Sequence, residues 1–174
     1  ASTPLPLALL PQQGAAGIRR ADGAEFGSGC FYYAASTPWN NMGTDGITIA
    51  FSGYCPFLPS VGSWVFGRDN PGAGVGAGGV SSVAFLQSNT LASGIDWLTE
   101  HRVVVTATIG GNVRALLDGV EVYNTTDAGI SSWERTMIYM YSLGFTFSGL
   151  FAIDSRVSNS EMTNLDNFLQ YGPV

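Results

Sequence analysis

The chain has few charged residues and no lysine. Its seven basic residues are all arginines, set against 13 acidic residues and a net charge of −6. Charged residues make up 11% of the chain, where about 25% is usual. A surface of uncharged polar residues would explain this, and so would a surface covered by neighbouring subunits, because the centres of interfaces are depleted in charge. The negative balance argues against nucleic acid as a partner, since binding phosphates requires a basic surface.

The sequence is also poor in residues used for catalysis and metal binding. His101 is the single histidine, and no Gly-x-Ser-x-Gly motif accompanies it, which favours a structural histidine. The spaced Cys/His pairs of a zinc site are missing. Cys30 and Cys55 could form one disulfide or remain two buried thiols. No apolar run is long enough to span a bilayer, so we expect no membrane insertion.

The first twenty residues contain three prolines and several leucines but no strand-like alternation. Proline removes backbone donors and disfavours regular pairing, so this segment is either a flexible tail or an extended arm laid on this domain or on a neighbour. The leucines favour an arm over residues 1–24, followed by one domain over residues 25–174. The residues expected to dock the arm are Leu5, Leu7, Leu9 and Leu10.

Apolar and polar residues alternate along much of the remaining chain, as in half-buried strands. The clearest stretch runs from His101 to Thr126, where Gly110-Gly111 and Asp118-Gly119 mark two tight turns. This pattern predicts a three-stranded antiparallel meander. Further strands are expected over residues 47–51, 64–68, 80–87, 136–143 and 149–154, and the glycine-rich segment 72–79 is expected to be a loop.

One helix is expected near the C-terminus. Ser158 and Glu161 have the spacing of a capping box, in which the serine hydroxyl accepts from a first-turn amide and the glutamate reaches back. Apolar residues follow at helical spacing, and Gly172-Pro173 would end the helix.

These features, in this order, resemble the laminin-G-like branch of the concanavalin A-like lectin/glucanase superfamily. The resemblance rests on Trp97 followed by His101–Thr106, on the hairpin from Arg114 to Val122, and on the closing strand and helix from Gly149 to Leu169. It implies an all-β fold, a jelly-roll sandwich of two antiparallel sheets with one short C-terminal helix. The N-terminal arm has no counterpart in the family pattern.

Catalysis is not expected. The glucanases of this superfamily carry Glu-x-Asp-x-Glu on one strand, which places three carboxylates on one face around the scissile bond. No such triplet occurs in this chain. A divergent glycoside hydrolase therefore remains only a remote alternative.

The sequence contains candidate residues for two kinds of ligand site, one for calcium and one for sugar. The resemblance implies that Ca²⁺ could bind at the loop end of the sandwich, through Asp69, Asn70 and Asp127, although such residues more often cap their own turns. A sugar would need an exposed aromatic side chain with polar neighbours. The candidates for carbohydrate binding are Trp133, Glu134, Arg135, Tyr139 and Tyr141.

Two functions follow as hypotheses. The first is a non-catalytic structural or adhesion subunit of a larger particle, on a phage or other virion surface, with a lectin-like body and the arm bound to copies of itself or to other subunits. The second is a secreted, extracellular lectin-like module that binds glycans. The two overlap, because a particle surface protein can also bind sugars.

Overall fold

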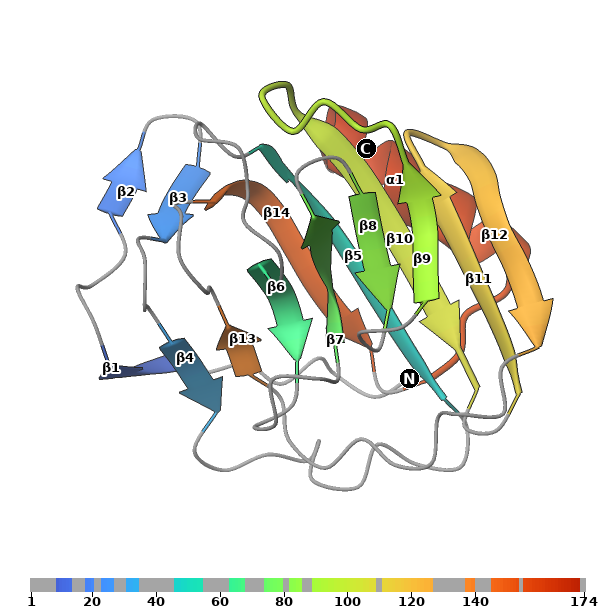
Figure 1. The fold of residues 1–174 in the computed structure, drawn as a ribbon, viewed down its shortest axis with the longest axis horizontal. Coiled ribbons are helices and arrows are strands. Elements are labelled where there is room, and N and C mark those ends of the chain that lie inside the picture. Colours follow the sequence, from blue (N-terminus) through green and yellow to red (C-terminus); the bar gives the residue numbers. More distant parts are fainter. Residues whose placement is uncertain are drawn as a thin grey trace.

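The computed structural model is an all-β protein with one C-terminal helix (Figure 1). It describes residues 9–13, 18–20, 23–26, 31–34, 46–54, 63–67, 74–79, 82–85, 89–108, 111–126, 137–139, 145–153 and 155–172. Within these residues the strands form two antiparallel sheets of seven strands each. In this part of the chain the predicted all-β class and the short C-terminal helix are confirmed.

The first sheet has the strand order β1-β4-β13-β6-β7-β8-β9. Its strands are β1 (Leu9–Gln13), β4 (Phe31–Ala34), β13 (Met137–Tyr139), β6 (Ser63–Gly67), β7 (Gly74–Gly79), β8 (Ser82–Phe85) and β9 (Asn89–Ser93). The second sheet has the order β12-β11-β10-β5-β14-β3-β2. Its strands are β12 (Val120–Thr126), β11 (Asn112–Leu117), β10 (His101–Ala107), β5 (Ile47–Tyr54), β14 (Phe145–Ile153), β3 (Gly23–Phe26) and β2 (Ile18–Arg20).

The predicted meander is present as β10, β11 and β12. Val105 pairs with Ala115, and Ala115 with Tyr123, so three successive strands lie side by side. The turn between β11 and β12 has positive φ at Asp118 (50°) and at Gly119 (81°), which explains the Asp-Gly sequence at this place. The strand β5 then pairs along the whole of β10.

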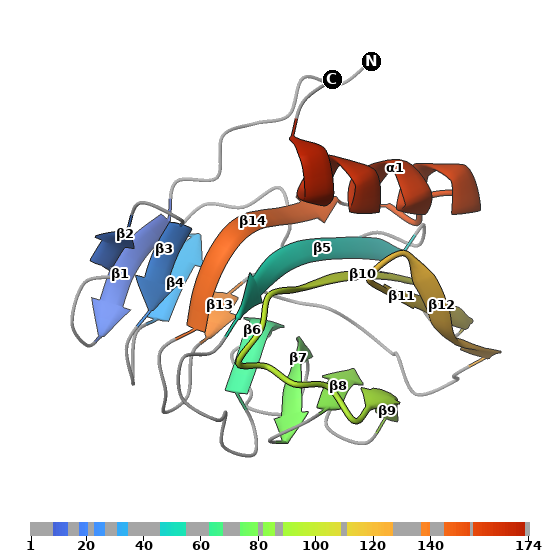
Figure 2. The same cartoon turned by 90° about the horizontal axis from the view of Figure 1, so that it is seen from above.

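Helix α1 (Asn159–Tyr171) covers the outer face of the second sheet, mainly over β10 and β5. Figure 2 shows the helix on one side of the curved layer formed by β14, β5 and β10, with β6 to β9 on the other side. Met162 of the helix packs on Ala50, Val104 and Leu116, and all four are buried. The predicted capping box is also present: the Ser158 side chain accepts from the Glu161 amide, and the Glu161 side chain accepts from the Ser158 amide.

Strand β10 is buried on both faces. Val103, Val105 and Ala107 point away from the helix, and Val104 points toward it; all four are at most 2% exposed. Trp97, in the segment just before β10, is fully buried. The core of the described region therefore has two layers, one between sheet and helix and one on the other face of the sheet.

One sequence prediction is wrong, and a second is not confirmed. The glycine-rich segment expected to be a loop contains β7, which pairs with β6 on one side and β8 on the other. Ladder hydrogen bonds to two neighbours outweigh the low strand propensity of glycine here. The separate N-terminal arm is not confirmed, because part of residues 1–24 lies in strands: β1 pairs with β4, and β2 with β3. Leu9 and Leu10 lie in β1, whereas Leu5 and Leu7 lie outside the described residues.

Candidate functional site

The outer face of β11 and β12 carries a connected network of polar side chains that the helix leaves uncovered. We call Asn112, Arg114, Glu121 and Asn124 the polar edge. The Arg114 guanidinium donates to Glu121 Oε2 from both Nε (2.8 Å) and Nη2. Asn124 Nδ2 donates to Glu121 Oε1 at 3.3 Å, and Asn112 Nδ2 donates to Asn124 Oδ1 at 3.0 Å. The network therefore crosses from β11 to β12 at two places, Arg114–Glu121 and Asn112–Asn124.

A β-bulge in β12 makes this network possible. Glu121 and Asn124 are three positions apart, so a regular strand would place them on opposite faces. Ala115 pairs with Tyr123 and Leu116 with Glu121, which leaves Val122 as an extra residue without a Cα partner. The extra residue returns Glu121 to the face that carries Arg114 and Asn124. Bulges often re-aim side chains in this way next to functional sites.

The polar edge is anionic at Glu121 and cationic at Arg114, so its charges balance. The hydrogen bonds from Arg114 hold the pKa of Glu121 below its ordinary value. The side chain of Glu121 is 39% exposed and that of Arg114 is 16% exposed. Arg156 extends the network, because its Nη2 donates to Asn112 Oδ1 at 3.3 Å.

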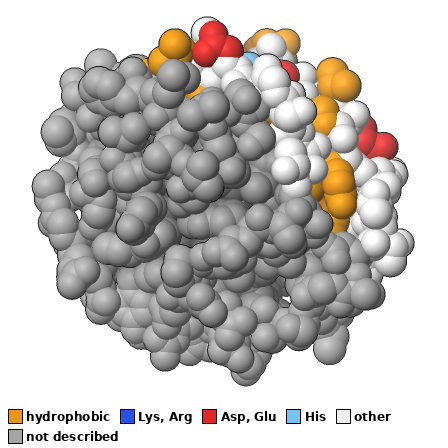
Figure 3. All heavy atoms as spheres, in the orientation of Figure 1, with side chains coloured by type: hydrophobic (Ala, Val, Ile, Leu, Met, Phe, Trp, Pro, Cys, Tyr) orange, Lys and Arg blue, Asp and Glu red, His pale blue; other side chains and the backbone are white. Residues whose placement is uncertain are grey.

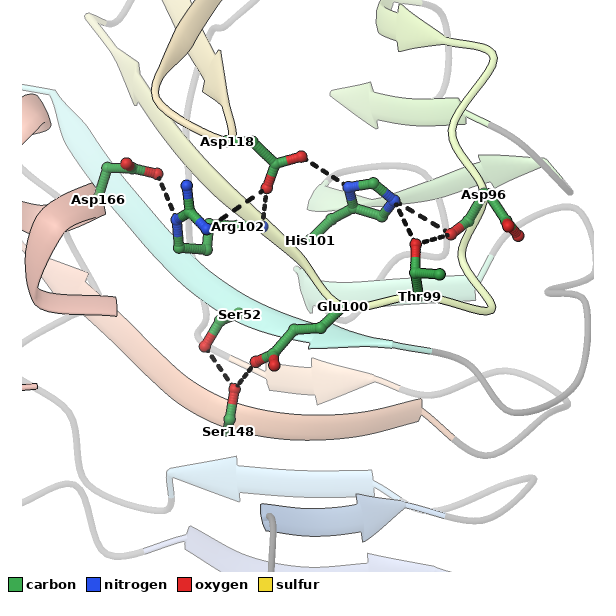
Figure 4. Close-up of polar contacts among 9 residues, drawn as sticks. All are labelled: Ser52, Asp96, Thr99, Glu100, His101, Arg102, Asp118, Ser148 and Asp166. Atoms are coloured by element: carbon green, nitrogen blue, oxygen red, sulfur yellow. Dashed lines mark hydrogen bonds and ion pairs between the residues drawn. The ribbon is translucent and has the colours of Figure 1, made fainter. Parts of the chain in front are cut away.

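A second polar cluster surrounds His101 at the N-terminal end of β10 (Figure 4). His101 Nδ1 lies 2.7 Å from Asp118 Oδ2, and because a carboxylate only accepts, this ring nitrogen carries the proton of the bond. His101 Nε2 lies 3.1 Å from the Asp96 carbonyl and 3.2 Å from the Thr99 hydroxyl. The ring also meets buried Trp97 edge to face, at 5.8 Å between centroids.

Thr99, His101 and Asp118 stand in the order of a hydroxyl nucleophile, a base and an acid. The Thr99 hydroxyl, however, donates to the Asp96 carbonyl at 2.9 Å, not to the imidazole. Asp118 also accepts from the Arg102 amide at 2.9 Å, which holds the turn against β10. We therefore interpret His101 as a structural residue that joins the segment before β10 to the β11–β12 turn.

Arg102 connects this turn to the helix. Its Nε donates to Asp166 Oδ1 of α1 at 3.1 Å, and its Nη1 lies 3.9 Å from Asp118 Oδ1. The Asp166 side chain is only 6% exposed. Asp118 thus bonds to His101 and Arg102, whereas Glu121, across the tight turn, bonds to Arg114.

A third contact joins Ser52 of β5, Ser148 of β14 and Glu100. The two serine hydroxyls lie 2.7 Å apart, and Ser148 donates to Glu100 Oε1. Figure 4 shows this contact beside the His101 cluster but separate from it. It ties together strands that are distant in the sequence, and its role is structural.

Most of the site residues predicted from the sequence lie outside the described residues. These are Trp133, Glu134, Arg135 and Tyr141 for sugar, and Asp69, Asn70 and Asp127 for calcium. Tyr139 lies in β13, where its backbone pairs with Phe31. No cluster of three or more His, Cys, Asp or Glu residues suited to a metal occurs in the part of the chain that the structure describes. No helix in that part is long and apolar enough to cross a membrane.

The sequence interpretation missed the polar edge. Its only trace in the sequence is the recurrence of polar residues at Asn112, Arg114, Glu121 and Asn124 in the two outer strands of the meander. That signal is weak, because the bulge that brings the last two onto one face has no sequence signature.

Comparison with known proteins identifies the fold but no family. No protein-family profile matches the chain, and no curated protein matches it. Among solved structures, it is similar to the binding domain of botulinum neurotoxin serotype G (TM-score 0.67, 9% identity, 95% of this chain and 47% of that one). It is also similar to Trypanosoma rangeli sialidase (TM-score 0.65, 14% identity, 89% of this chain and 29% of that one).

A third similar structure is the binding domain of botulinum neurotoxin DC in complex with SialylT (TM-score 0.57, 12% identity, 89% of this chain and 42% of that one). The chain thus spans less than half the length of each of these three proteins. At such low identity the likeness establishes an antiparallel all-β fold and nothing more specific. Membership of the concanavalin-like superfamily, expected from the sequence, is not confirmed.

Proposed function

We propose that this chain is a non-catalytic, carbohydrate-binding module with a lectin-like body, a jelly-roll sandwich of the concanavalin-like kind. The observation that carries the proposal is the structural likeness of about nine-tenths of the chain to toxin binding domains, one of them in complex with SialylT. The low share of charged residues, 11%, supports it, because sugars are bound through hydrogen bonds more than through ion pairs.

The absence of catalysis is part of this proposal. The sequence has no Glu-x-Asp-x-Glu strand. The single histidine is engaged by Asp118 and packs edge-on against Trp97. The likeness to a sialidase does not argue against this, because the chain covers only 29% of that enzyme.

A glycan array probed with the fluorescently labelled chain tests the proposal. We expect selective binding to a few glycans, weakened by Trp133→Ala if the predicted aromatic site is used. Repeating the array with a chelator tests whether Asp69, Asn70 and Asp127 bind calcium that the interaction needs. A blank array would contradict the proposal, and new reducing ends released from bound glycans would favour the hydrolase alternative.

A second candidate role is that of a subunit displayed on a larger particle such as a virion. The observations that favour it are the 11% charged residues, the lack of lysine, and exposed apolar side chains on the edge strand β12. Val120 is 65% exposed and Val122 is 38% exposed. Figure 3 shows hydrophobic side chains at the right-hand edge of the molecule, where β12 lies in Figure 1.

Light scattering after size-exclusion chromatography tests this second role. A self-associating subunit would elute as an oligomer at micromolar concentration. A stable monomer whose residues 1–24 are readily removed by protease would argue instead for a secreted lectin-like module.

A further inference from the structure

The polar edge has the donors and acceptors that a sugar requires. A sugar hydroxyl both donates and accepts, so it is best bound by side chains that offer both kinds of group. Asn112 and Asn124 each carry two amide N–H groups and one carbonyl oxygen, Glu121 only accepts, and Arg114 only donates. Within the described residues, each of the two amide nitrogens donates one hydrogen bond, leaving its second N–H for a ligand.

Stability of the fold does not account for this network. Exposed ion pairs contribute little, typically about 0–1 kcal/mol, because solvent screens them and the side chains lose entropy. The chain has few charges, yet Arg114, Glu121 and Arg156 gather here with two asparagines. The bulge at Val122 interrupts the regular register, and its visible effect is to bring Glu121 beside Asn124. A bulge that brings polar groups together on one face points to binding, because bulges are over-represented next to functional sites.

The size and charge of the polar edge define the ligand class. Two positions along a strand span about 7 Å and neighbouring strands lie about 5 Å apart, a footprint of the order of one sugar ring. Within the polar edge the more exposed charge is the Glu121 carboxylate, 39% exposed against 16% for Arg114, and this carboxylate repels an acidic sugar. Arg156 adds one positive charge beside Asn112, to whose Oδ1 its Nη2 donates. Hydrogen bonds from Arg114 hold the pKa of Glu121 below its ordinary value, which favours the charged carboxylate.

From these observations we propose that the polar edge is a hydrogen-bonding subsite for an uncharged saccharide, formed by Asn112, Arg114, Glu121 and Asn124. This inference rests on the proposed carbohydrate-binding function and adds a second contact surface, separate from the predicted Trp133 region. Glu121 accepts from sugar hydroxyls, and the two asparagine amides donate to them.

The test compares two neighbouring positions of one strand. Asn124 belongs to the polar edge, whereas the next residue, Thr125, pairs with Val113 on the other face; both are exposed. Asn124→Ala and the control Thr125→Ala are produced in a bacterial host, so that the Asn124-Thr125-Thr126 sequon stays unmodified. Both variants, Glu121→Gln and the unmodified chain are applied to an array of neutral and acidic oligosaccharides. The strongest neutral ligand is then titrated by calorimetry.

We expect Asn124→Ala to weaken binding of the neutral ligand about tenfold or more, as the loss of one or two hydrogen bonds predicts. Glu121→Gln should weaken it as well, and Thr125→Ala should not. Unchanged melting temperatures would confirm that the variants keep the fold. If Asn124→Ala melts at a lower temperature than the unmodified chain, the affinity of the isosteric variant Glu121→Gln tests the subsite instead.

The outcomes separate this inference from the proposed function. Glycan binding that is lost in Trp133→Ala but kept in Asn124→Ala and Glu121→Gln would overturn the subsite and leave the function standing. Binding of acidic glycans alone would also overturn it. A blank array would overturn the proposed function, and the subsite with it.

Discussion

The strands β10 and β12 belong to one meander but have opposite environments. In β10, five of the seven residues are buried, and the other two are half-buried. In β12, six residues are exposed and one is half-buried. The difference lies in what surrounds each strand: β10 has a strand on each side and α1 above it, whereas β12 is the last strand of its sheet and the helix does not cover it. The same alternating pattern thus forms a core in one strand and a candidate binding surface in the other.

The largest expected effect comes from opening the layer between the helix and β10. Met162 is 1% exposed and packs on Val104, so Met162→Ala should lower the free energy of unfolding by about 2–5 kcal/mol. The control Val120→Ala truncates a side chain that is 65% exposed, and should change the free energy of unfolding by less than about 0.5 kcal/mol. Urea denaturation measures both. Equal losses would mean that the two strands do not differ as described.

A smaller effect is expected from the ion pairs on the two strands. Asp166→Ala leaves Arg102 without its closest carboxylate in a largely buried place, and should cost about 2 kcal/mol. Glu121→Gln, which breaks the exposed pair with Arg114, should shift the melting temperature far less. Calorimetric melting of both variants checks the contrast. A larger shift for Glu121→Gln would show that the polar edge exists for stability, which would weaken its interpretation as a binding site.

The sequence predicted the interior of this region better than its edge. The turn between β11 and β12 and the capped helix were predictable because Asp118-Gly119 and the Ser158–Glu161 pair satisfy local backbone requirements. The strand β7 was missed because its stability comes from pairing with β6 and β8, and a run of glycines does not indicate such pairing.

The polar edge was missed for a different reason. Its side chains converge only because Val122 bulges out of register, and because the helix stops short of the outer strand. Both are properties of the folded sheet, so no pattern of residue types along the chain could indicate them.

The helix cap should have an effect of about 1 kcal/mol. Ser158→Ala removes the acceptor for the Glu161 amide, and helix caps of this kind are typically worth about that much. The matched control is Asn164→Ala, an exposed helix position where alanine is the better helix former. Urea denaturation should show a loss only for Ser158→Ala. Equal behaviour of the two variants would mean that the cap does not stabilise the helix.

The smallest expected effect is a dependence on pH through Glu161. Hydrogen bonds from the Ser158 hydroxyl and amide hold the pKa of Glu161 below its ordinary value. A carboxyl whose pKa is lower in the folded state stabilises the protein above the pKa of the unfolded chain, and this contribution disappears as the pH falls through the lower folded value. The melting temperatures of the unmodified chain and of Glu161→Gln should therefore differ at neutral pH and converge as the pH falls through the folded pKa of Glu161. A gap that stays constant with pH would contradict this assignment.

The central claim is that the polar edge, on the outer face of β11 and β12, binds sugar, whereas the buried strand β10 only supports the fold. The most direct measurement is calorimetric titration of the strongest neutral array ligand into Asn124→Ala and Thr125→Ala, side by side. The account predicts a loss of affinity of about tenfold or more for Asn124→Ala and none for Thr125→Ala. Equal affinities for the two variants would contradict it.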